Sequence, residues 1–372
     1  MPHLNLLAFE NCPDNRLGGQ ERSLLEVLQG LAAQGVEIDL AHIRTGNLES
    51  DYRTFAKSLI QLPGPFYFSC STALSSLRTL AKLVLRHWRH PWGILYVNQY
   101  LDIFLPVLLG KLIGRPVVAH LRLPPPNGTF SRQHKWGLNH CTQLIAISHA
   151  TAHAYRQSGI TAPIKVIHNG TNLTHFAPPP GPVSASAHIR VLYLGRVLPD
   201  KGVDVLVAAC ELASQSQPIQ LSVVGNPFPT DEGRAYHLSL KNRTEHGLLK
   251  GSFLPHVDDV RPLLASADVL VLPSRWPEPF GRVLIEAMAS GIPVIASNVG
   301  GIPEILNPDF ASHLVPPDDL KALAAAILRF GSWRATQPNL GTQMRQHVER
   351  HFDALSTHGK VLKILQDCIP RN

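Results

Sequence analysis

The stretch Val269–Glu304, with the sequence VLVLPSRWPEPFGRVLIEAMASGIPVIASNVGGIPE, decides the fold class of this chain. Its pattern predicts an apolar strand, a polar loop, a helix, a second apolar strand and a glycine turn. Because Pro279 and Gly281 interrupt the loop, the helix should begin near Gly281 with its first amides unpaired. Unpaired amides and the partial positive charge of a helix start suit a phosphate. We therefore expect a nucleotide diphosphate at this helix, with Glu278 and Glu286 close by.

The composition is that of a globular chain with two domains, because 372 residues exceed one ordinary core. Hydrophobic residues make up 44% and charged residues 16%, which excludes a disordered protein. No apolar run reaches the roughly 18 residues of a membrane span, and the start MPHLNLLAFEN lacks the features of a secretory signal. The five cysteines form no Cys-x-x-Cys pair, so we expect neither disulfides nor a zinc site. These features predict a cytoplasmic location.

The formal net charge of +7 is compatible with three kinds of partner: anionic small substrates, an anionic membrane surface or nucleic acid. Nucleic acid is the weakest of the three, since the sequence has no Lys/Arg run and no aromatic-basic repeat. We therefore expect no nucleic-acid partner.

The first half opens like a doubly wound α/β domain. An apolar strand at Leu4–Phe9 is followed by Gly18-Gly19, a helical apolar pattern and a second strand at Val36–Ile43. The dinucleotide fingerprint Gly-x-Gly-x-x-Gly is absent, so the glycine pair indicates either a close ligand approach or a tight turn. His120 lies at the end of a later predicted strand, which places it toward a ligand cleft.

The segment Ala73–His90 predicts a helix with Arg78, Lys82 and Arg86 on one face. A basic amphipathic helix can lie on an anionic membrane, which would make the protein a peripheral one at the inner face. The alternative is an ordinary surface helix whose apolar stripe packs in the core. The sequence leaves both interpretations open.

The stiff, small-residue segment APPPGPVSASA predicts a linker, after which the strand-and-helix pattern restarts. We expect an N-terminal, acceptor-side Rossmann-like domain over 1–178 and a linker over 179–187. A second Rossmann-like domain should follow over 188–350, and a helix over 351–372 should return to the first domain. Two such halves imply a cleft between them.

In the second half, Arg196 and Lys201 follow the first strand and so face the same sheet edge as the Gly281 helix start. Two fixed cations and free amides are suited to a diphosphate. The carboxylates of Glu278 and Glu286 accept hydrogen bonds, as the hydroxyls of a sugar and a ribose require.

Several short motifs lie at specific spacings along nearly the whole chain. They are Gly18-Gly19-Gln20-Glu21, Ser148, Asn169-Gly170 with Phe176, Gly195-Arg196-(four residues)-Lys201-Gly202, Glu278-Pro-Phe-Gly-(four residues)-Glu286-Ala287, and Gly300-Gly301-Ile302-Pro303-Glu304. In this combination the chain resembles the retaining glycosyltransferases of family 4, which have the α/β GT-B fold of two Rossmann-like doubly wound domains facing a central cleft.

The resemblance implies roles for individual residues. It assigns Arg196 and Lys201 to the diphosphate, Glu278 to the transferred sugar, and His120 to the region of the anomeric carbon; these four are the expected catalytic residues. The family commonly has a histidine-aspartate pair where this chain has His120-Leu121. The expected residues binding the sugar nucleotide are Gly18, Gly19, Gly195, Phe280, Gly281, Arg282, Val283, Leu284 and Glu286, the last at the ribose. A cation in the first turn of a helix opposes the macrodipole, so Arg282 should have an anionic partner. Glu286 one turn on is favoured over the alternative, a phosphate or an acidic acceptor.

The resemblance further implies a hexosyltransferase-like enzyme that retains anomeric configuration and uses a nucleotide-diphosphate sugar, with UDP- and GDP-sugars expected. No Asp-x-Asp pair occurs in the sequence, so we expect no metal and no cofactor, with Arg196 and Lys201 in the metal's place. The acceptor is a glycan, a lipid or a small molecule. Two alternatives stay open: a GT-B sugar-nucleotide epimerase, or a non-catalytic sugar-nucleotide-binding protein.

Overall fold

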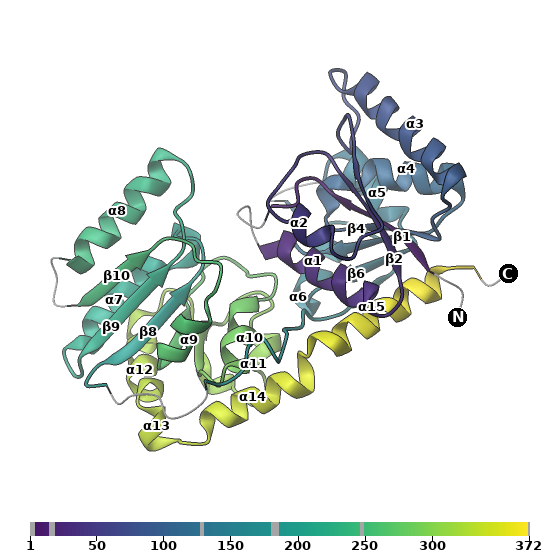
Figure 1. Ribbon diagram of the computed structural model, residues 1–372. Coiled ribbons are helices and arrows are strands. Elements are labelled where there is room, and N and C mark those ends of the chain that lie inside the picture. Colours follow the sequence, from purple (N-terminus) through teal and green to yellow (C-terminus); the bar gives the residue numbers. More distant parts are fainter. Residues whose placement is uncertain (1–3, 15–18, 127–129, 180–185, 246–248, 371–372) are drawn as a thin grey trace. The chain divides into compact units, whose positions relative to one another are not determined.

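The computed structural model describes residues 4–14, 19–126, 130–179, 186–245 and 249–370 (Figure 1). Contacts divide the chain into two compact units: unit 1 is Met1–Asn169 with Ala354–Asn372, and unit 2 is Gly170–Asp353. Residues 170–178, assigned from the sequence to the first domain, therefore cluster with unit 2. Most of the predicted linker, 180–185, lies outside the described residues.

Unit 1 is built on a seven-stranded sheet with the order β3-β2-β1-β4-β5-β6-β7, and all its strand pairs are parallel. The central strands are short apolar runs that are buried throughout, as expected for a parallel sheet covered on both faces. The strands are β1 (Asn5–Glu10), β2 (Glu37–His42), β3 (Ser58–Gln61), β4 (Ile94–Val97), β5 (Val117–Leu121), β6 (Gln143–Ala146) and β7 (Ile164–Val166).

Helices cover the two faces of this sheet and form a separate apolar core on each. The C-terminal helix packs beside the first helix, so the end of the chain completes one of these cores. The helices of unit 1 are α1 (Gly19–Ala32), α2 (Glu49–Tyr52), α3 (Ala73–Arg89), α4 (Phe104–Ile113), α5 (Arg132–Asn139), α6 (His149–Gln157) and α15 (Ala354–Cys368).

Unit 2 repeats this architecture on a six-stranded parallel sheet with the order β10-β9-β8-β11-β12-β13. Its strands are β8 (Ile189–Leu194), β9 (Ile219–Val224), β10 (Lys250–Leu254), β11 (Val269–Leu272), β12 (Val294–Ser297) and β13 (Leu314–Val315). Its helices are α7 (Val203–Ser214), α8 (Asp231–Glu245), α9 (Arg261–Ser266), α10 (Arg282–Ala289), α11 (Pro303–Leu306), α12 (Leu320–Gly331), α13 (Trp333–Thr336) and α14 (Leu340–His351).

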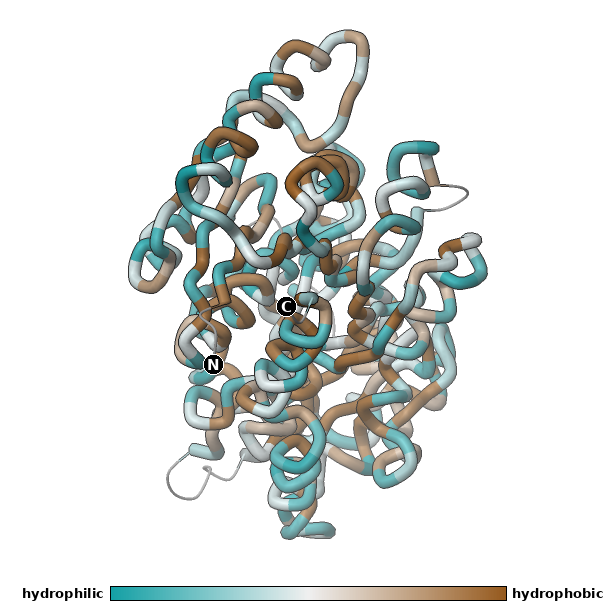
Figure 2. The backbone as a smooth tube through the Cα atoms, turned by 90° about the vertical axis from the view of Figure 1, so that its right-hand side faces the viewer, coloured by the Kyte–Doolittle hydropathy of each residue, from teal (hydrophilic) through white to brown (hydrophobic). Residues whose placement is uncertain are grey.

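Hydrophobic and hydrophilic residues alternate around the helices of the chain, as Figure 2 shows in brown and teal. This pattern is expected where one stripe of a helix packs on a sheet and the opposite stripe faces water. Within the described residues no helix is both long and apolar enough to cross a membrane.

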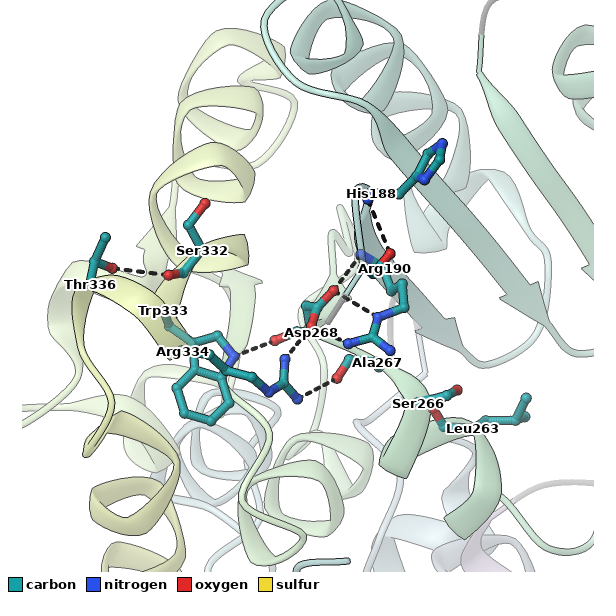
Figure 3. Close-up of polar contacts among 11 residues, drawn as sticks. His188, Arg190, Leu263, Ser266, Ala267, Asp268, Ser332, Trp333, Arg334 and Thr336 are labelled. Atoms are coloured by element: carbon teal, nitrogen blue, oxygen red, sulfur yellow. Dashed lines mark hydrogen bonds and ion pairs between the residues drawn. The ribbon is translucent and has the colours of Figure 1, made fainter. Parts of the chain in front are cut away.

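An ionic cluster lies at the amino end of β11 in unit 2, where the buried Asp268 lies between two arginines (Figure 3). The Asp268 carboxylate accepts hydrogen bonds from Arg190 Nε at 2.9 Å and Nη2 at 2.8 Å, and from the Arg334 guanidinium. Trp333 Nε1 donates to the Asp268 carbonyl at 2.9 Å. The cluster thus joins β8, β11 and α13 at the sheet edge opposite to the strand ends considered next.

Candidate functional site

The strand order of unit 2 reverses between β8 and β11, which lie side by side although they are far apart in sequence. In open α/β sheets ligands bind beyond the carboxyl ends of the strands at such a point. The loop after β8 carries Arg196 and Lys201, and the loop after β11 carries Glu278. The topology therefore brings these three predicted residues to one edge of one sheet.

Lys201 and Glu278 form an ion pair through Lys201 Nζ and Glu278 Oε1. The same carboxylate oxygen accepts a hydrogen bond from the hydroxyl of the buried Ser274 at 2.7 Å. Both charged side chains are mostly buried, with exposed fractions of 18% for Lys201 and 11% for Glu278. Because both charged groups are largely removed from water, the ion pair is held in a single geometry. Sequence reasoning missed Ser274, which only its position four residues before Glu278 could have suggested.

The loop that carries Glu278 lies in close contact with two glycines, Gly202 and Gly300. A Cβ on Gly202 would lie 2.1 Å from the Pro273 carbonyl oxygen, and one on Gly300 would lie 2.2 Å from that of Glu278. Both glycines have positive φ angles, +67° and +56°, which other residues adopt at a cost. The amide of Gly301 donates to the Glu278 carbonyl at 2.8 Å. The Lys201 turn and the glycine turn after β12 therefore fix the backbone of Glu278.

Arg275 joins the same loops through its side chain. Its guanidinium donates to both carboxylate oxygens of Asp204, each at 2.7 Å, and to the Pro199 carbonyl at 2.7 Å. It also pairs with Asp318 at 2.5 Å. Because Pro199 lies in the turn of Lys201, Arg275 connects this turn to the loop of Glu278. The sequence analysis did not single out Arg275.

Helix α10 begins at Arg282, as the sequence predicted, with Gly281 as its N-cap at φ +108° and no side-chain capping bond. Phe280 is buried, and its ring packs edge-on against Phe352 at 5.7 Å. The expected partner of Arg282 is confirmed, because its Nη2 lies 3.3 Å from Glu286 Oε1. The beginning of α10 is thus anchored in the core of unit 2.

The remaining predicted residues of unit 2 differ in exposure. Gly195 and Arg196 are exposed, and Arg196 is held at its carbonyl by the hydroxyl of the buried Tyr193 at 2.7 Å. Val283 is half-buried. Leu284 is fully buried, and its amide donates to the Gly281 carbonyl at 3.0 Å.

Unit 1 has its own reversal of strand order, between β1 and β4. Glu10 ends β1 and Asn98 follows β4, and Asn98 Nδ2 donates to Glu10 Oε2 at 2.8 Å. Asn98 Oδ1 accepts from Arg122 Nε at 2.7 Å. All three side chains are buried. Sequence reasoning missed this polar chain, because its members are polar residues at the ends of three separate strands, and only the pairing of those strands joins them.

Burial governs the titration of the acids at this edge. Desolvation raises the pKa of Glu10 well above its ordinary value, with contributions from the charges of Asp102 and Glu21. Desolvation likewise raises the pKa of Asp102 to about 6, against hydrogen bonds from Gln99 and Asn11 that lower it. Negative charge on these two side chains is therefore costly.

His120 belongs to β5 and is buried, with Nδ1 lying 2.6 Å from the Tyr96 hydroxyl and 3.3 Å from Arg122 Nη2. Burial, followed by the charge of Arg122, holds the pKa of His120 well below its ordinary value. Gly19 is the first residue of α1 in the same unit, whereas Gly18 lies outside the described residues. The predicted residues thus fall into two groups, one in each unit.

The two halves of the chain match two family models. Residues 17–175 match "Glycosyltransferase Family 4", and residues 188–332 match "Glycosyl transferases group 1". The chain belongs to glycosyltransferase family 4. The family predicted from the spacing of the motifs is therefore confirmed.

Relatives with known names are also glycosyltransferases. The chain is 31% identical to the glycogen synthase of Mycobacterium tuberculosis over an alignment 295 residues long that covers 72% of this chain and 66% of the synthase. It is 31% identical to the D-inositol 3-phosphate glycosyltransferase of Streptomyces avermitilis over an alignment 201 residues long that covers 50% of this chain and 43% of that enzyme. The chain thus spans about two thirds of the length of the synthase and less than half of the length of the inositol phosphate glycosyltransferase.

Solved structures share the fold along the whole chain. A glycosyltransferase from Rickettsia africae superposes with a TM-score of 0.86 at 20% identity, covering 100% of both chains. Anabaena HepE in complex with UDP-glucose superposes with a TM-score of 0.79 at 23% identity, covering 98% of this chain and 100% of HepE. At these identities the likeness concerns the fold, and it confirms the GT-B fold class expected for a family 4 glycosyltransferase.

Proposed function

We propose that this protein is a retaining glycosyltransferase that moves a sugar from a nucleotide-diphosphate donor, foremost a UDP-sugar, to an acceptor without a metal or other cofactor. The observation that carries the proposal is the buried Lys201–Glu278 pair at the β8/β11 reversal, with Arg196 on the same loop as Lys201. The neighbour HepE, solved with UDP and with UDP-glucose, supports UDP as the first nucleotide to test.

The chemistry follows from where charge develops. Breaking the bond between the anomeric carbon and the phosphate oxygen gathers negative charge on the leaving diphosphate. Arg196, Lys201 and the first amides of α10 would stabilise that charge more in the transition state than in the ground state. Two cations can do this without a metal, which agrees with the lack of an Asp-x-Asp pair in the sequence. With retention, the leaving phosphate oxygen takes the acceptor's proton on the same face of the sugar.

A panel of sugar nucleotides tests this proposal. In EDTA, a UDP-sugar at a hundred times its Kd should stabilise the protein by about 2.7 kcal/mol, which raises the Tm by roughly 5–10 °C. GDP- and ADP-sugars serve as matched ligands in the same thermal-shift series. NMR of the product should then show the anomeric configuration of the donor sugar. Stabilisation that requires added Mg²⁺ or Mn²⁺, or a product with inverted configuration, would contradict the mechanism.

We also propose that unit 1 binds an anionic membrane surface through α3, on the cytoplasmic side. One apolar stripe of this helix faces outward: Leu74, Leu77, Leu85 and Trp88 are exposed, Trp88 by 75%. The inward face carries the buried Leu83, with Leu80 and Val84 packed against the core of unit 1. On the same face the hydroxyls of Ser76 and Thr79 donate to the carbonyls of Tyr67 and Gly64. The expectation of an ordinary surface helix that packs apolar residues in the core is therefore met by one face of α3, and the exposed apolar stripe on the other face supports the membrane proposal.

The charge of α3 favours anionic lipid as the partner of this stripe. Arg78, Lys82 and Arg89 are exposed beside it, and the helix contains no acidic residue. Arg86, which the sequence placed on the basic face, is half-buried and donates to Ser58 at 3.0 Å. An apolar stripe with Trp and Leu, flanked by Lys and Arg, is typical of helices that lie in a membrane interface. All five cysteines are free thiols, which agrees with a cytoplasmic location.

Co-sedimentation with vesicles tests the membrane proposal. Neutralising Arg78, Lys82 and Arg89 with Gln should weaken binding to phosphatidylglycerol vesicles by about a hundredfold, because each charge contributes about 1 kcal/mol. The pair Leu77→Ser and Trp88→Ser should also release the protein. The matched control is Leu238→Ser with Leu355→Ser, two exposed leucines on α8 and α15. Equal recovery of all variants in the pellet would refute the role of α3.

A further inference from the structure

The hydrogen bonds around His120 determine which of its nitrogens carries a proton. Arg122 Nη2 lies 3.3 Å from Nδ1 and can only donate. Nδ1 is therefore the unprotonated, accepting nitrogen, and the Tyr96 hydroxyl at 2.6 Å also donates to it. Burial raises the pKa of Tyr96 to about 12, so its hydroxyl keeps the proton that it donates. The proton of a neutral imidazole then resides on Nε2.

Arg122 is held in place by groups from three parts of unit 1. Its Nε donates to Asn98 Oδ1 at 2.7 Å, and its Nη1 donates to Asn169 Oδ1 at 3.3 Å. Its Nη2 also lies 3.4 Å from the Ser23 carbonyl of α1. The Asn98 amide is oriented in turn by Glu10, which accepts from Nδ2. A guanidinium with this many fixed acceptors cannot turn away from Nδ1 without breaking several hydrogen bonds.

We propose that Arg122 and Tyr96 are positioning residues that fix His120 as an uncharged imidazole donating a hydrogen bond from Nε2 to an oxygen of a substrate bound at unit 1. Nε2 is buried and has no partner among the described residues. A buried N–H group without a partner destabilises a fold, so its presence points to a substrate oxygen as its acceptor. The inference rests on the proposed function for the identity of that substrate.

This arrangement excludes His120 from general-base catalysis. A base would need an unprotonated nitrogen facing the substrate, and the unprotonated nitrogen here is covered by Arg122 and Tyr96. Protonation is also opposed, because burial and the Arg122 cation both lower the pKa of His120. Among the described groups, Arg122 and Tyr96 are the titratable side chains bonded to the imidazole, and Glu10 lies beyond Asn98. This role suits a chain that has His120-Leu121-Arg122 in place of a histidine-aspartate pair.

NMR of ¹⁵N-histidine-labelled full-length protein without any substrate tests the arrangement directly. The His120 signals are assigned by their loss in His120→Gln. We expect a protonated Nε2 and an unprotonated Nδ1, unchanged from pH 5.5 to 8.5, in the wild type. In Arg122→Met we expect His120 to titrate within this range or to populate both tautomers. Wild-type signals with Nδ1 protonated, or a wild-type His120 that titrates near pH 6.5, would overturn the proposal.

Kinetics provide the second readout, with Tyr155→Phe as a matched control. The Tyr155 hydroxyl is also buried in unit 1, but it donates to the Leu123 carbonyl at 3.0 Å. Tyr96→Phe and Arg122→Met should lower kcat/KM tenfold or more through lost alignment, with Arg122→Lys recovering part of the loss. Tyr155→Phe should stay within twofold of the wild type. If Tyr96→Phe and Arg122→Met keep both the wild-type tautomer and the wild-type kcat/KM, neither residue positions His120. The NMR result needs no substrate, so it stands or falls independently of the proposed reaction.

Discussion

Replacement of Lys201 by Ala is expected to lower kcat/KM for sugar transfer by a hundredfold or more. A cation placed at a developing diphosphate acts mainly on the transition state, and loss of one such group costs about 3 kcal/mol in barrier height. The same change leaves the mostly buried Glu278 with Ser274 as its hydrogen-bond partner and without the counter-charge of Lys201. Glu278→Gln should therefore also lose activity, since it removes the charge that orients Lys201.

Lys57→Ala is the matched control for this experiment. Lys57 pairs with Glu37 at 2.7 Å, but both side chains are about half-exposed, so their pair contributes little. We expect its kcat and KM to stay within twofold of the wild type. Wild-type turnover in a folded Lys201→Ala protein, judged by a cooperative thermal transition above the assay temperature, would remove Lys201 from the mechanism.

The sequence predicted the part of the site that depends on local pattern and on parallel strand order. The beginning of α10 near Gly281 follows from Pro279, Gly281 and the apolar runs on either side, and the structure has the helix from Arg282. The loop of Lys201 and the loop of Glu278 follow parallel strands, so their meeting at one sheet edge could be anticipated. Local pattern and topology were sufficient for these elements.

The sequence could not predict contacts that depend on which distant side chains meet. Glu10 and Asn98 are 88 residues apart, and their hydrogen bond exists only because β1 and β4 are neighbours. The periodicity of α3 showed which residues share a face, but not which face is turned to the core. Helix α8 was not predicted because its apolar residues are sparse and show no helical period.

Replacement of Asp268 by Ala is expected to be the most destabilising of these changes, although Asp268 lies far from Lys201 at the opposite end of the sheet. Asp268 is buried and compensates Arg190 and Arg334, which are 20% and 29% exposed (Figure 3). Its removal leaves two partly buried cations without an anion, at a cost of about 3 kcal/mol after allowance for their exposure.

Thermal unfolding of Asp268→Ala should show a Tm lower by roughly 5–10 °C, with kcat retained at low temperature. The matched control is Asp259→Ala, because Asp259 forms a similar two-bond pair with Arg261, at 2.8 Å for each bond, but on the exposed surface. Its midpoint should hardly change. A Tm for Asp268→Ala equal to that of the control would show that the cluster contributes no more than a surface pair. If Asp268→Ala instead loses activity while its Tm equals that of the wild type, the residues at the amino end of β11 influence the candidate site. Asp268 directly precedes β11, and the loop of Glu278 follows it. Measuring stability and activity of the same variant therefore separates the anchoring of this strand from the positioning of Glu278.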